Sequence, residues 1–389
     1  MVEIHPPAVS KLPASPRKRS RLAGRLAIVS RALWERARSE RKLSIAPQRV
    51  LIAHHLLLGD TLMLTPLLAK LRALYPAAEV VMAVPEAFAP LYAGRPYGVS
   101  AQPWDPRDPL NAPVFGKPGF DLALVPGDNR YSWLALALGA RWILAFAGDR
   151  PAYKSWPVDQ LVPYPQAPAA WGDMVAGLLP GPAPGAYQPQ DWSPPPAAAF
   201  ALPTGPYAVL HLGASSEHKR WPRDSWRVLA GSLAANGVTP VWSAGRGEES
   251  LVQETDPQGR WPSFAGILDL PQLWHLLLSA KLLVSPDTGV AHLGRIVGTP
   301  TVALFGPGSP VLCGAGDFWR DSPYRAVCLE PFPCRDQRLL FKREISWVRR
   351  CARGARDCPV PRCMTGIGLT DVYRAIADLG VALKDTTGS

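Results

Sequence analysis

The chain has 389 residues, of which 47% are hydrophobic, and a formal net charge of +11 at pH 7. The length gives room for two ordinary domains with sizeable cores. No apolar run approaches the roughly 20 residues of a membrane-spanning helix and no signal-peptide pattern is present, so we expect a cytoplasmic protein. Residues 1–48 hold eleven Lys and Arg against three Glu, which leaves the remainder close to neutral. We therefore expect no nucleic-acid surface across the fold.

Residues 1–48 are predicted to form a basic extension. Residues 1–20 are rich in Pro, Ser, Lys and Arg, a composition that favours disorder. Residues 21–41 carry a rough apolar stripe among arginines, consisting of Leu22, Leu26, Ile28, Val29, Leu33 and Trp34. A basic amphipathic helix of this kind can lie on an anionic membrane, here the inner face of the cytoplasmic membrane. The alternatives are a helix packed on the body of the protein, a solvated tail, or a basic tail that binds nucleic acid.

Residues 49–180 are predicted to form a first α/β domain. The expected elements are strands at residues 49–55, 79–84, 120–125 and 141–146, a loop at 56–61 and a helix from there to 74. A strand–helix–strand opening predicts a doubly wound parallel sheet, whose ligands bind at the carboxyl ends of the strands. Asp60 follows the first strand and is therefore expected at that edge.

Residues 181–206, rich in Pro, Ala and Gly, are predicted to be a linker to a second α/β domain at residues 207–370. The expected strands lie at residues 207–212, 239–244, 281–285 and 301–305, and the expected helices at 224–235, 247–254 and 270–280. Residues 371–389 are predicted to be a terminal helix, reaching residue 383, and a tail. The two halves show no long-range internal repeat.

The stretch at residues 285–310 reads as a strand end, a helix and the next strand. Pro286 ends the first strand, Asp287 and Thr288 are residue types that start helices, and Gly289 lets the backbone approach a ligand. A helix that begins after a parallel strand directs unpaired N–H groups at an anion such as a phosphate or pyrophosphate. His292, one turn later, can add a donor. A self-capping Asp and a core His that bind nothing are the alternative.

The pattern DTGVAH, from Asp287 to His292, followed by GTPTVALFGPGSP, resembles the donor-site signature of glycosyltransferase family 9. That family contains the ADP-heptose:lipopolysaccharide heptosyltransferases. The setting of Asp60 (GDT, then LRALYP) resembles the family's N-terminal signature, and residues 211–222 (HLGASSEHKRWP) resemble its phosphate-binding turn. The resemblance covers about residues 49–383. It implies the GT-B fold, in which two Rossmann-like domains face each other across a cleft.

The resemblance also implies roles for individual residues. Asp60 would be the general base that deprotonates the acceptor hydroxyl, so that the sugar is transferred with inversion. The donor-binding residues would be Ser215, Ser216 and Lys219 at the diphosphate, Glu248 at the ribose, and Asp287, Thr288, Gly289 and His292 at the ADP part and the sugar. Such groups can stabilise the leaving group without a metal. The alternatives are a helix N-cap for Asp60, a surface lysine, ordinary turn serines, and Glu249 in place of Glu248.

The implied function is an inverting transfer of heptose, or a similar sugar, from an ADP-sugar to a lipopolysaccharide core or related cell-envelope acceptor. The acceptor would be a lipid-linked oligosaccharide, and no cofactor is expected. His54 and His55 depart from the small hydroxyl residues common in that loop of the family, which bears on the acceptor. Another nucleotide sugar, a protein or other glycan acceptor, or a non-catalytic nucleotide-binding protein remain alternatives. Neither half opens with GxGxxG and a later acidic residue, which argues against a dinucleotide oxidoreductase.

All six cysteines lie in the last fifth of the chain, at Cys313, Cys328, Cys334, Cys351, Cys358 and Cys363. Their spacings lack paired CxxC motifs, so a zinc ribbon is not indicated. Reduced core cysteines are expected. A structural metal site with four thiolate ligands is the alternative, because some members of the family carry a Cys-rich segment that ends in Cys-Met before the last helix.

Overall fold

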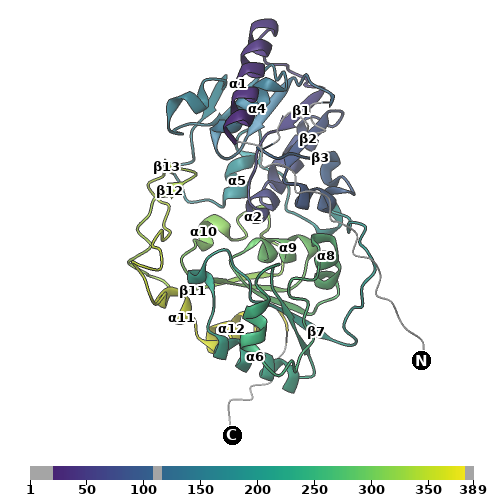
Figure 1. Ribbon diagram of the computed structural model, residues 1–389, viewed down its shortest axis with the longest axis vertical. Helices are drawn as coiled ribbons and strands as arrows, with labels where there is room; N and C mark the ends of the chain where they lie inside the picture. Colours follow the sequence, from purple (N-terminus) through teal and green to yellow (C-terminus); the bar gives the residue numbers. More distant parts are fainter. Residues whose placement is uncertain (1–20, 108–115, 382–389) are drawn as a thin grey trace, which may run out of the picture.

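The computed structural model describes residues 21–107 and 116–381. It contains two parallel sheets, one in each half of the chain, which lie one above the other along the long axis of the molecule (Figure 1). The expectations for residues 1–20 and for the tail beyond residue 381 lie outside the described residues.

The first sheet has the strand order β3-β2-β1-β4-β5-β6, and all of its pairs are parallel. Its strands are β1 (Arg49–Ile52), β2 (Glu79–Val84), β3 (Val99–Pro103), β4 (Leu122–Val125), β5 (Ile143–Phe146) and β6 (Gln160–Val162). The order reverses between β1 and β4, which is where such sheets place ligands. The sequence did not predict β3 and β6, because both are short edge strands without an apolar run.

The segment after β1 differs from the expected loop and single helix. It forms two helices, α2 (Leu58–Leu62) and α3 (Thr65–Leu74), so Asp60 lies inside a helix. The break falls where Thr65 Oγ1 donates a hydrogen bond to the Leu62 carbonyl, 2.6 Å away. Pro66 follows in the first turn of α3, where its missing N–H costs nothing.

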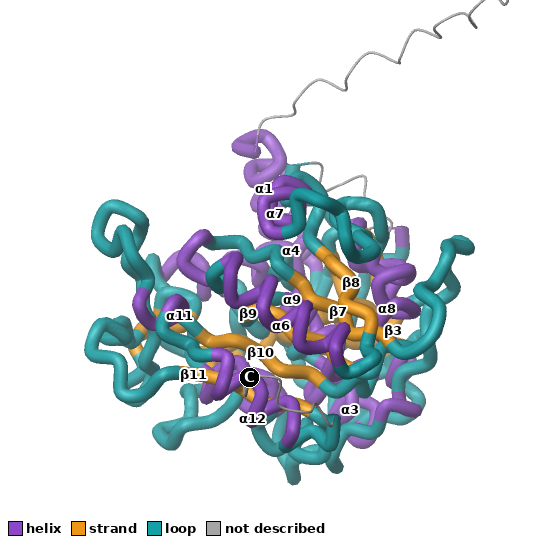
Figure 2. The backbone as a smooth tube through the Cα atoms, turned by 90° about the horizontal axis from the view of Figure 1, so that it is seen from below, coloured by secondary structure: helices purple, strands orange, loops and turns teal. Residues whose placement is uncertain are grey.

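The second sheet has the strand order β11-β10-β9-β7-β8 and is also parallel throughout. Figure 2 shows these strands side by side. They are β7 (Tyr207–His211), β8 (Thr239–Ser243), β9 (Leu282–Pro286), β10 (Thr301–Phe305) and β11 (Tyr324–Cys328). The accompanying helices are α6 (Arg223–Ala235), α7 (Glu249–Thr255), α8 (Leu270–Leu278), α9 (Gly289–Val297) and α12 (Leu369–Ala377). The predicted elements are thus present, with small shifts at most of their ends, and β11 is an addition. The terminal helix was predicted to reach residue 383, which is wrong, because α12 ends at Ala377.

Helix α1 (Arg21–Arg38) lies on the first half, against α4 (Ser132–Ala137). Its inward side is a narrow stripe of Gly24, Ile28 and Ala32, spaced four residues apart. The expected apolar stripe is therefore divided. Ile28 faces the core, whereas Leu22, Leu26, Leu33 and Trp34 are exposed.

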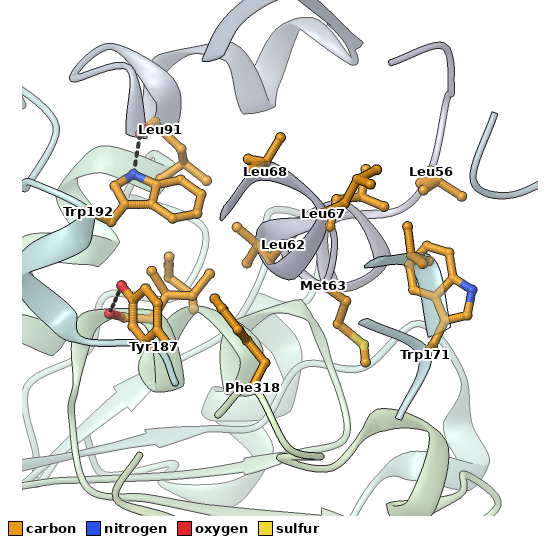
Figure 3. Close-up of a cluster of buried hydrophobic side chains, with 14 of the residues drawn as sticks. Leu56, Leu62, Met63, Leu67, Leu68, Leu91, Trp171, Tyr187, Trp192 and Phe318 are labelled. Atoms are coloured by element: carbon orange, nitrogen blue, oxygen red, sulfur yellow. Dashed lines mark hydrogen bonds between the residues drawn. The ribbon is translucent and has the colours of Figure 1, made fainter. Parts of the chain in front are cut away.

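Residues 181–206, the predicted linker, contain little regular structure and are mostly exposed, but they are anchored by two buried aromatic side chains. The Tyr187 hydroxyl donates to the Ile296 carbonyl in α9, 2.8 Å away, and Trp192 Nε1 donates to the Leu91 carbonyl in the first half, 3.1 Å away. Both rings are buried in a core that runs between the two halves (Figure 3). The segment therefore joins both halves by packing, while the boundaries at residues 180 and 206 stay predictions.

Residues 329–351 leave the second half after β11, touch the first half and return; we call them the cross-over arm. Figure 1 shows its hairpin, β12 (Leu339–Leu340) and β13 (Arg343–Glu344), beside the upper half. Arg343 is 2% exposed and donates to the carbonyls of Gly127 (3.0 Å) and Ala147 (2.9 Å) and to Asn129 Oδ1 (2.6 Å). A buried guanidinium with several acceptors therefore holds the arm to the carboxyl edge of the first sheet.

Candidate active site

Helix α2 carries Asp60 directly against the start of α9, and two glycines allow this close approach. A Cβ added to Gly59 would lie 2.8 Å from His292 Cδ2, and one added to Gly289 would lie 2.9 Å from Leu58 Cβ. The space beside the Cα of Gly289 is therefore filled by Leu58 of the first half. As a result, the partly buried Asp60 of the first half lies beside the loop and helix of the second.

Lys219 and Asp287 form an ion pair at this junction. Lys219 Nζ lies 2.9 Å from Asp287 Oδ2 and donates to the Asp287 carbonyl, 2.7 Å away. The Asp287 side chain is 7% exposed and that of Lys219 is 24% exposed, so water screens the pair only in part. The self-capping role considered for Asp287 is wrong: Thr288 occupies the N-cap of α9, and its hydroxyl lies 3.1 Å from Ser285 Oγ. The surface-lysine alternative is equally wrong for Lys219.

His292 is buried and neutral. Its Nδ1 accepts a hydrogen bond from Arg295 Nη2, 2.8 Å away, and burial lowers its pKa well below the usual value, with Arg295 and Lys219 adding to the decrease. Because Nδ1 accepts, the ring proton lies on Nε2, the atom beside Gly59. Arg295 is itself fixed by the Gly314 carbonyl, 2.6 Å away. His292 can therefore act as an oriented neutral donor at the start of α9.

The burial of Asp60 favours a carboxyl group that titrates near neutral pH. Burial raises the pKa of Asp60 to about 6, and the Asp287 carboxylate adds to the increase, whereas Arg350 and Lys219 act against it. A general base works best when its pKa lies near the pH of the reaction. The helix-cap alternative is not seen, because the N-cap of α2 is Leu57.

The other predicted donor residues lie in turns after β7 and β8. Glu248 accepts from the backbone N–H groups of Ala214 and Gly245, each at 3.0 Å, so it ties the two turns together. Glu249, the alternative, instead accepts from the Gly247 N–H at 2.9 Å. Ser215 is exposed and Ser216 partly buried in the turn that leads to Lys219. The ribose and phosphate roles of these residues stay predictions.

Sequence reasoning missed three residues at this junction: Gly59, Arg295 and Arg350. Gly59 stood in the recognised GDT pattern, but nothing in the pattern showed that it faces His292. Arg295 lies one turn after His292 on α9, so the helical spacing could have paired them. Arg350 lies at the end of the cross-over arm, and no periodicity in the sequence links it to Asp60.

His54 and His55, which depart from the family's usual loop, follow β1 in the first half. His54 is fully buried, its Nδ1 accepts from the Leu56 N–H at 3.2 Å, and burial lowers its pKa to about 3. His55 is half-buried with its ring 5.9 Å from that of Trp104. His54 is thus a neutral core residue, and His55 is the one of the two that can meet a ligand.

The six cysteines are free thiols. Cys363 is buried, and Cys313 and Cys328 are partly buried against the core, so the expectation of core cysteines is wrong only for Cys334, Cys351 and Cys358. Cys334, Cys351, Cys358 and Cys363 line one small cavity of about 150 Å³. Within residues 21–107 and 116–381, no three His, Cys, Asp or Glu side chains form a group that could hold a metal ion. The four-thiolate alternative stays a prediction.

Structures of known glycosyltransferases share this two-sheet architecture. The chain is similar to the structure of E. coli ADP-heptose lps heptosyltransferase II, with 19% identity, a TM-score of 0.64, and coverage of 85% of this chain and 98% of that chain. It is also similar to E. coli heptosyltransferase WaaC with ADP, with 19% identity, a TM-score of 0.61 and coverage of 85% and 99%. These likenesses and the two facing sheets define a GT-B fold.

The model of glycosyltransferase family 9 (heptosyltransferase) matches residues 119–334, which is more than half of the chain. The chain belongs to this family. Among curated proteins it is 34% identical over 122 residues to lipopolysaccharide heptosyltransferase 1 of Escherichia coli (strain K12). That match covers 29% of this chain and 36% of the relative, so the chain aligns with about a third of the relative's length.

Gly59→Ala tests the contact between α2 and α9. The added methyl group would lie 2.8 Å from the fixed ring of His292, so we expect a loss of about 1–3 kcal/mol in the free energy of unfolding. Gly231→Ala, in α6, is the matched control because its added methyl group meets nothing within 4 Å. Chemical denaturation of both variants measures the difference. Equal stability of the two variants would contradict the contact.

Proposed function

We propose that the protein is an inverting glycosyltransferase that moves a heptose, or a similar sugar, from an ADP-sugar to a lipopolysaccharide core or related cell-envelope acceptor. The observation that carries this proposal is the position of Asp60 beside Lys219, Asp287 and His292, at the junction of the two halves. The names of the relatives, lipopolysaccharide heptosyltransferases 1 and 2, support heptose as the sugar.

In the proposed reaction, Asp60 takes the proton of an acceptor hydroxyl. The acceptor oxygen forms a bond to the anomeric carbon, and the bond from that carbon to the diphosphate oxygen breaks on the opposite face, so the configuration inverts. The negative charge passes to the departing ADP. Lys219, the start of α9 and the Nε2–H of His292 would stabilise this charge. The proposal therefore needs no metal ion for the transfer.

The test is the release of ADP by the purified full chain, supplied with ADP-heptose and a heptose-deficient lipopolysaccharide core. We expect release that depends on both substrates and persists in EDTA, and a product whose anomeric configuration is opposite to that of the donor. If another nucleotide sugar or acceptor is used instead, the heptose assignment is wrong. If nucleotides bind and no sugar is transferred, the chain is a nucleotide-binding protein without transferase activity.

We also propose that α1 contacts an anionic membrane surface from the cytoplasmic side, where a lipid-linked acceptor would be met. Leu22, Leu26, Leu33 and Trp34 are each more than half exposed, at 52% to 65%. Arg25, Arg36 and Arg38 are exposed on the same helix, and the Arg38 guanidinium lies 4.4 Å from the centre of the Trp34 ring. Exposed apolar side chains among arginines suit the interface of an anionic bilayer. None of the helices in residues 21–107 and 116–381 is long and apolar enough to span a bilayer.

The double variant Leu26→Glu, Trp34→Glu tests this contact. We expect binding to phosphatidylglycerol vesicles to fall roughly tenfold or more, because apolar burial is lost and negative charge is added. Ile267→Glu, at a 66%-exposed position in the second half, is the control. Co-sedimentation at two salt concentrations gives the affinities. Binding of the wild type to duplex DNA in place of vesicles would favour the nucleic-acid alternative.

A further inference from the structure

The cross-over arm ends at the proposed active site. Arg335, near its start, donates to the Gly306 carbonyl from Nε (3.0 Å) and Nη2 (2.7 Å). At its end, the Cys351 N–H donates to the Pro307 carbonyl, 2.9 Å away, and Arg350 pairs with Gln337 in an isolated antiparallel bridge. These bonds fix both ends of the arm to the loop that follows β10. Arg350 is thereby held next to this loop.

The same loop borders Asp287. A Cβ added to Gly308 would lie 2.4 Å from Asp287 Oδ2, so the carboxylate of the ion pair lies directly against the loop. Cys313 lies in the short helix α10 (Pro310–Cys313) that follows this loop. Its charged neighbours are Asp287, Asp60, Lys219 and Arg350. The backbone therefore brings Arg350 from the arm into the group that contains Asp60 and the Lys219–Asp287 pair.

Arg350 differs from the other cations of this group in having no partner. Lys219 is paired with Asp287, and Arg295 is engaged by His292 and the Gly314 carbonyl. Among residues 21–107 and 116–381, no side-chain hydrogen bond or ion pair involves the half-buried Arg350 guanidinium. A departing nucleoside diphosphate carries more negative charge than a lysine already neutralised by a carboxylate can offset. Arg350 is therefore the cation of this group that is free to meet an added negative charge.

We propose that Arg350 binds the diphosphate of the nucleotide as a second cation beside Lys219, and that the cross-over arm serves to place it there. The identity of the nucleotide rests on the function proposed above, but the role of Arg350 does not depend on the sugar. A guanidinium forms two parallel hydrogen bonds to phosphate oxygens, which a lysine cannot do. The arm thus supplies a part of the diphosphate site that neither sheet carries.

The test is the affinity of the full chain for ADP, UDP and inorganic pyrophosphate, measured by calorimetry. We expect Arg350→Gln to weaken the binding of pyrophosphate and of the preferred nucleotide about tenfold or more, and Arg350→Lys to weaken it less. Arg349→Gln is the matched control, because that neighbour is exposed and donates only to the carbonyls of Ser346 and Val348. Thermal unfolding confirms that each variant is folded.

A second readout separates binding from a purely structural role. Arg350 and Lys219 favour the ionised form of Asp60, whereas Asp287 opposes it; the nearby His292 is neutral and burial raises the pKa of the Cys313 thiol. Loss of Arg350 should therefore raise the pKa of Asp60 and move the acid limb of kcat/KM to higher pH. Unchanged affinity for pyrophosphate and nucleotide in Arg350→Gln, or no binding of either by the wild type, overturns the proposal. Arg350-dependent binding without heptose transfer overturns only the proposed function.

Discussion

We expect Asp60→Asn to lower kcat by about 10²- to 10⁴-fold, because an amide cannot accept the proton of the acceptor hydroxyl. The substitution keeps the size of the side chain, so the contact between α2 and α9 is preserved. Nucleotide affinity should stay close to that of the wild type, which separates a loss of proton transfer from a loss of binding. Steady-state kinetics and calorimetry measure the two effects. Full activity in the variant would contradict the role of Asp60.

The raised pKa of Asp60 sets the direction in which activity and stability change with pH. The pKa of Asp60 is raised to about 6, so kcat/KM should fall as the pH drops below about 6 and the base becomes protonated. For stability the raised pKa has the opposite consequence: the ionised carboxylate destabilises the native state above about pH 6, and this cost disappears as the pH falls toward 4. Asp60→Asn should therefore melt at an equal or higher temperature than the wild type at pH 7.5. Asp321→Asn, at an exposed position, is the control.

Lys219→Met should lower kcat by about 10²- to 10³-fold, because the departing diphosphate loses a fixed cation. It also leaves Asp287, a carboxylate that is 6% exposed, without its partner. Because Lys219 lowers the pKa of Asp60, its loss should move the acid limb of kcat/KM to higher pH. Lys281→Met, at an exposed lysine of the second half, is the matched control.

The double variant Lys219→Met, Asp287→Asn distinguishes two explanations of a defect at Lys219. If Lys219 only neutralises Asp287, removal of both charges should restore activity together with stability. If Lys219 binds the diphosphate, stability should recover while kcat stays low, with an interaction energy between the two sites that is measurable in a double-mutant cycle. Recovery of activity would show that Lys219 is a structural residue.

The sequence predicts the central strands well because their patterns are local. Strands β2 and β10 are apolar runs bounded by Pro or Gly, and their observed limits are those expected from the run itself. The edge strands β3 and β6 are short and partly polar, so their pairing depends on neighbours that are distant in the chain. The break between α2 and α3 is different, because it is local and Pro66 could have indicated it.

The candidate site likewise contains residues that local patterns predict and partners that they do not. Asp60, Lys219, Asp287 and His292 were singled out by residue type and short spacing, and the structure brings them together. Their partners could not be read from spacing: the bond from Lys219 to Asp287 joins positions 68 residues apart in the chain. Arg350 reaches the site because the cross-over arm first contacts the other half of the molecule and then returns. No local sequence pattern indicates this path.

The two attachments of the cross-over arm limit how far the two halves of the molecule can move apart. Arg335 holds its base to Gly306, and Arg343 holds its tip to Gly127 on the opposite half. An enzyme that works between two lobes must part them for spent nucleotide to escape. Because the cross-over arm is bonded to both halves, we expect the halves to open by a small rotation about the arm and not by a large hinge motion.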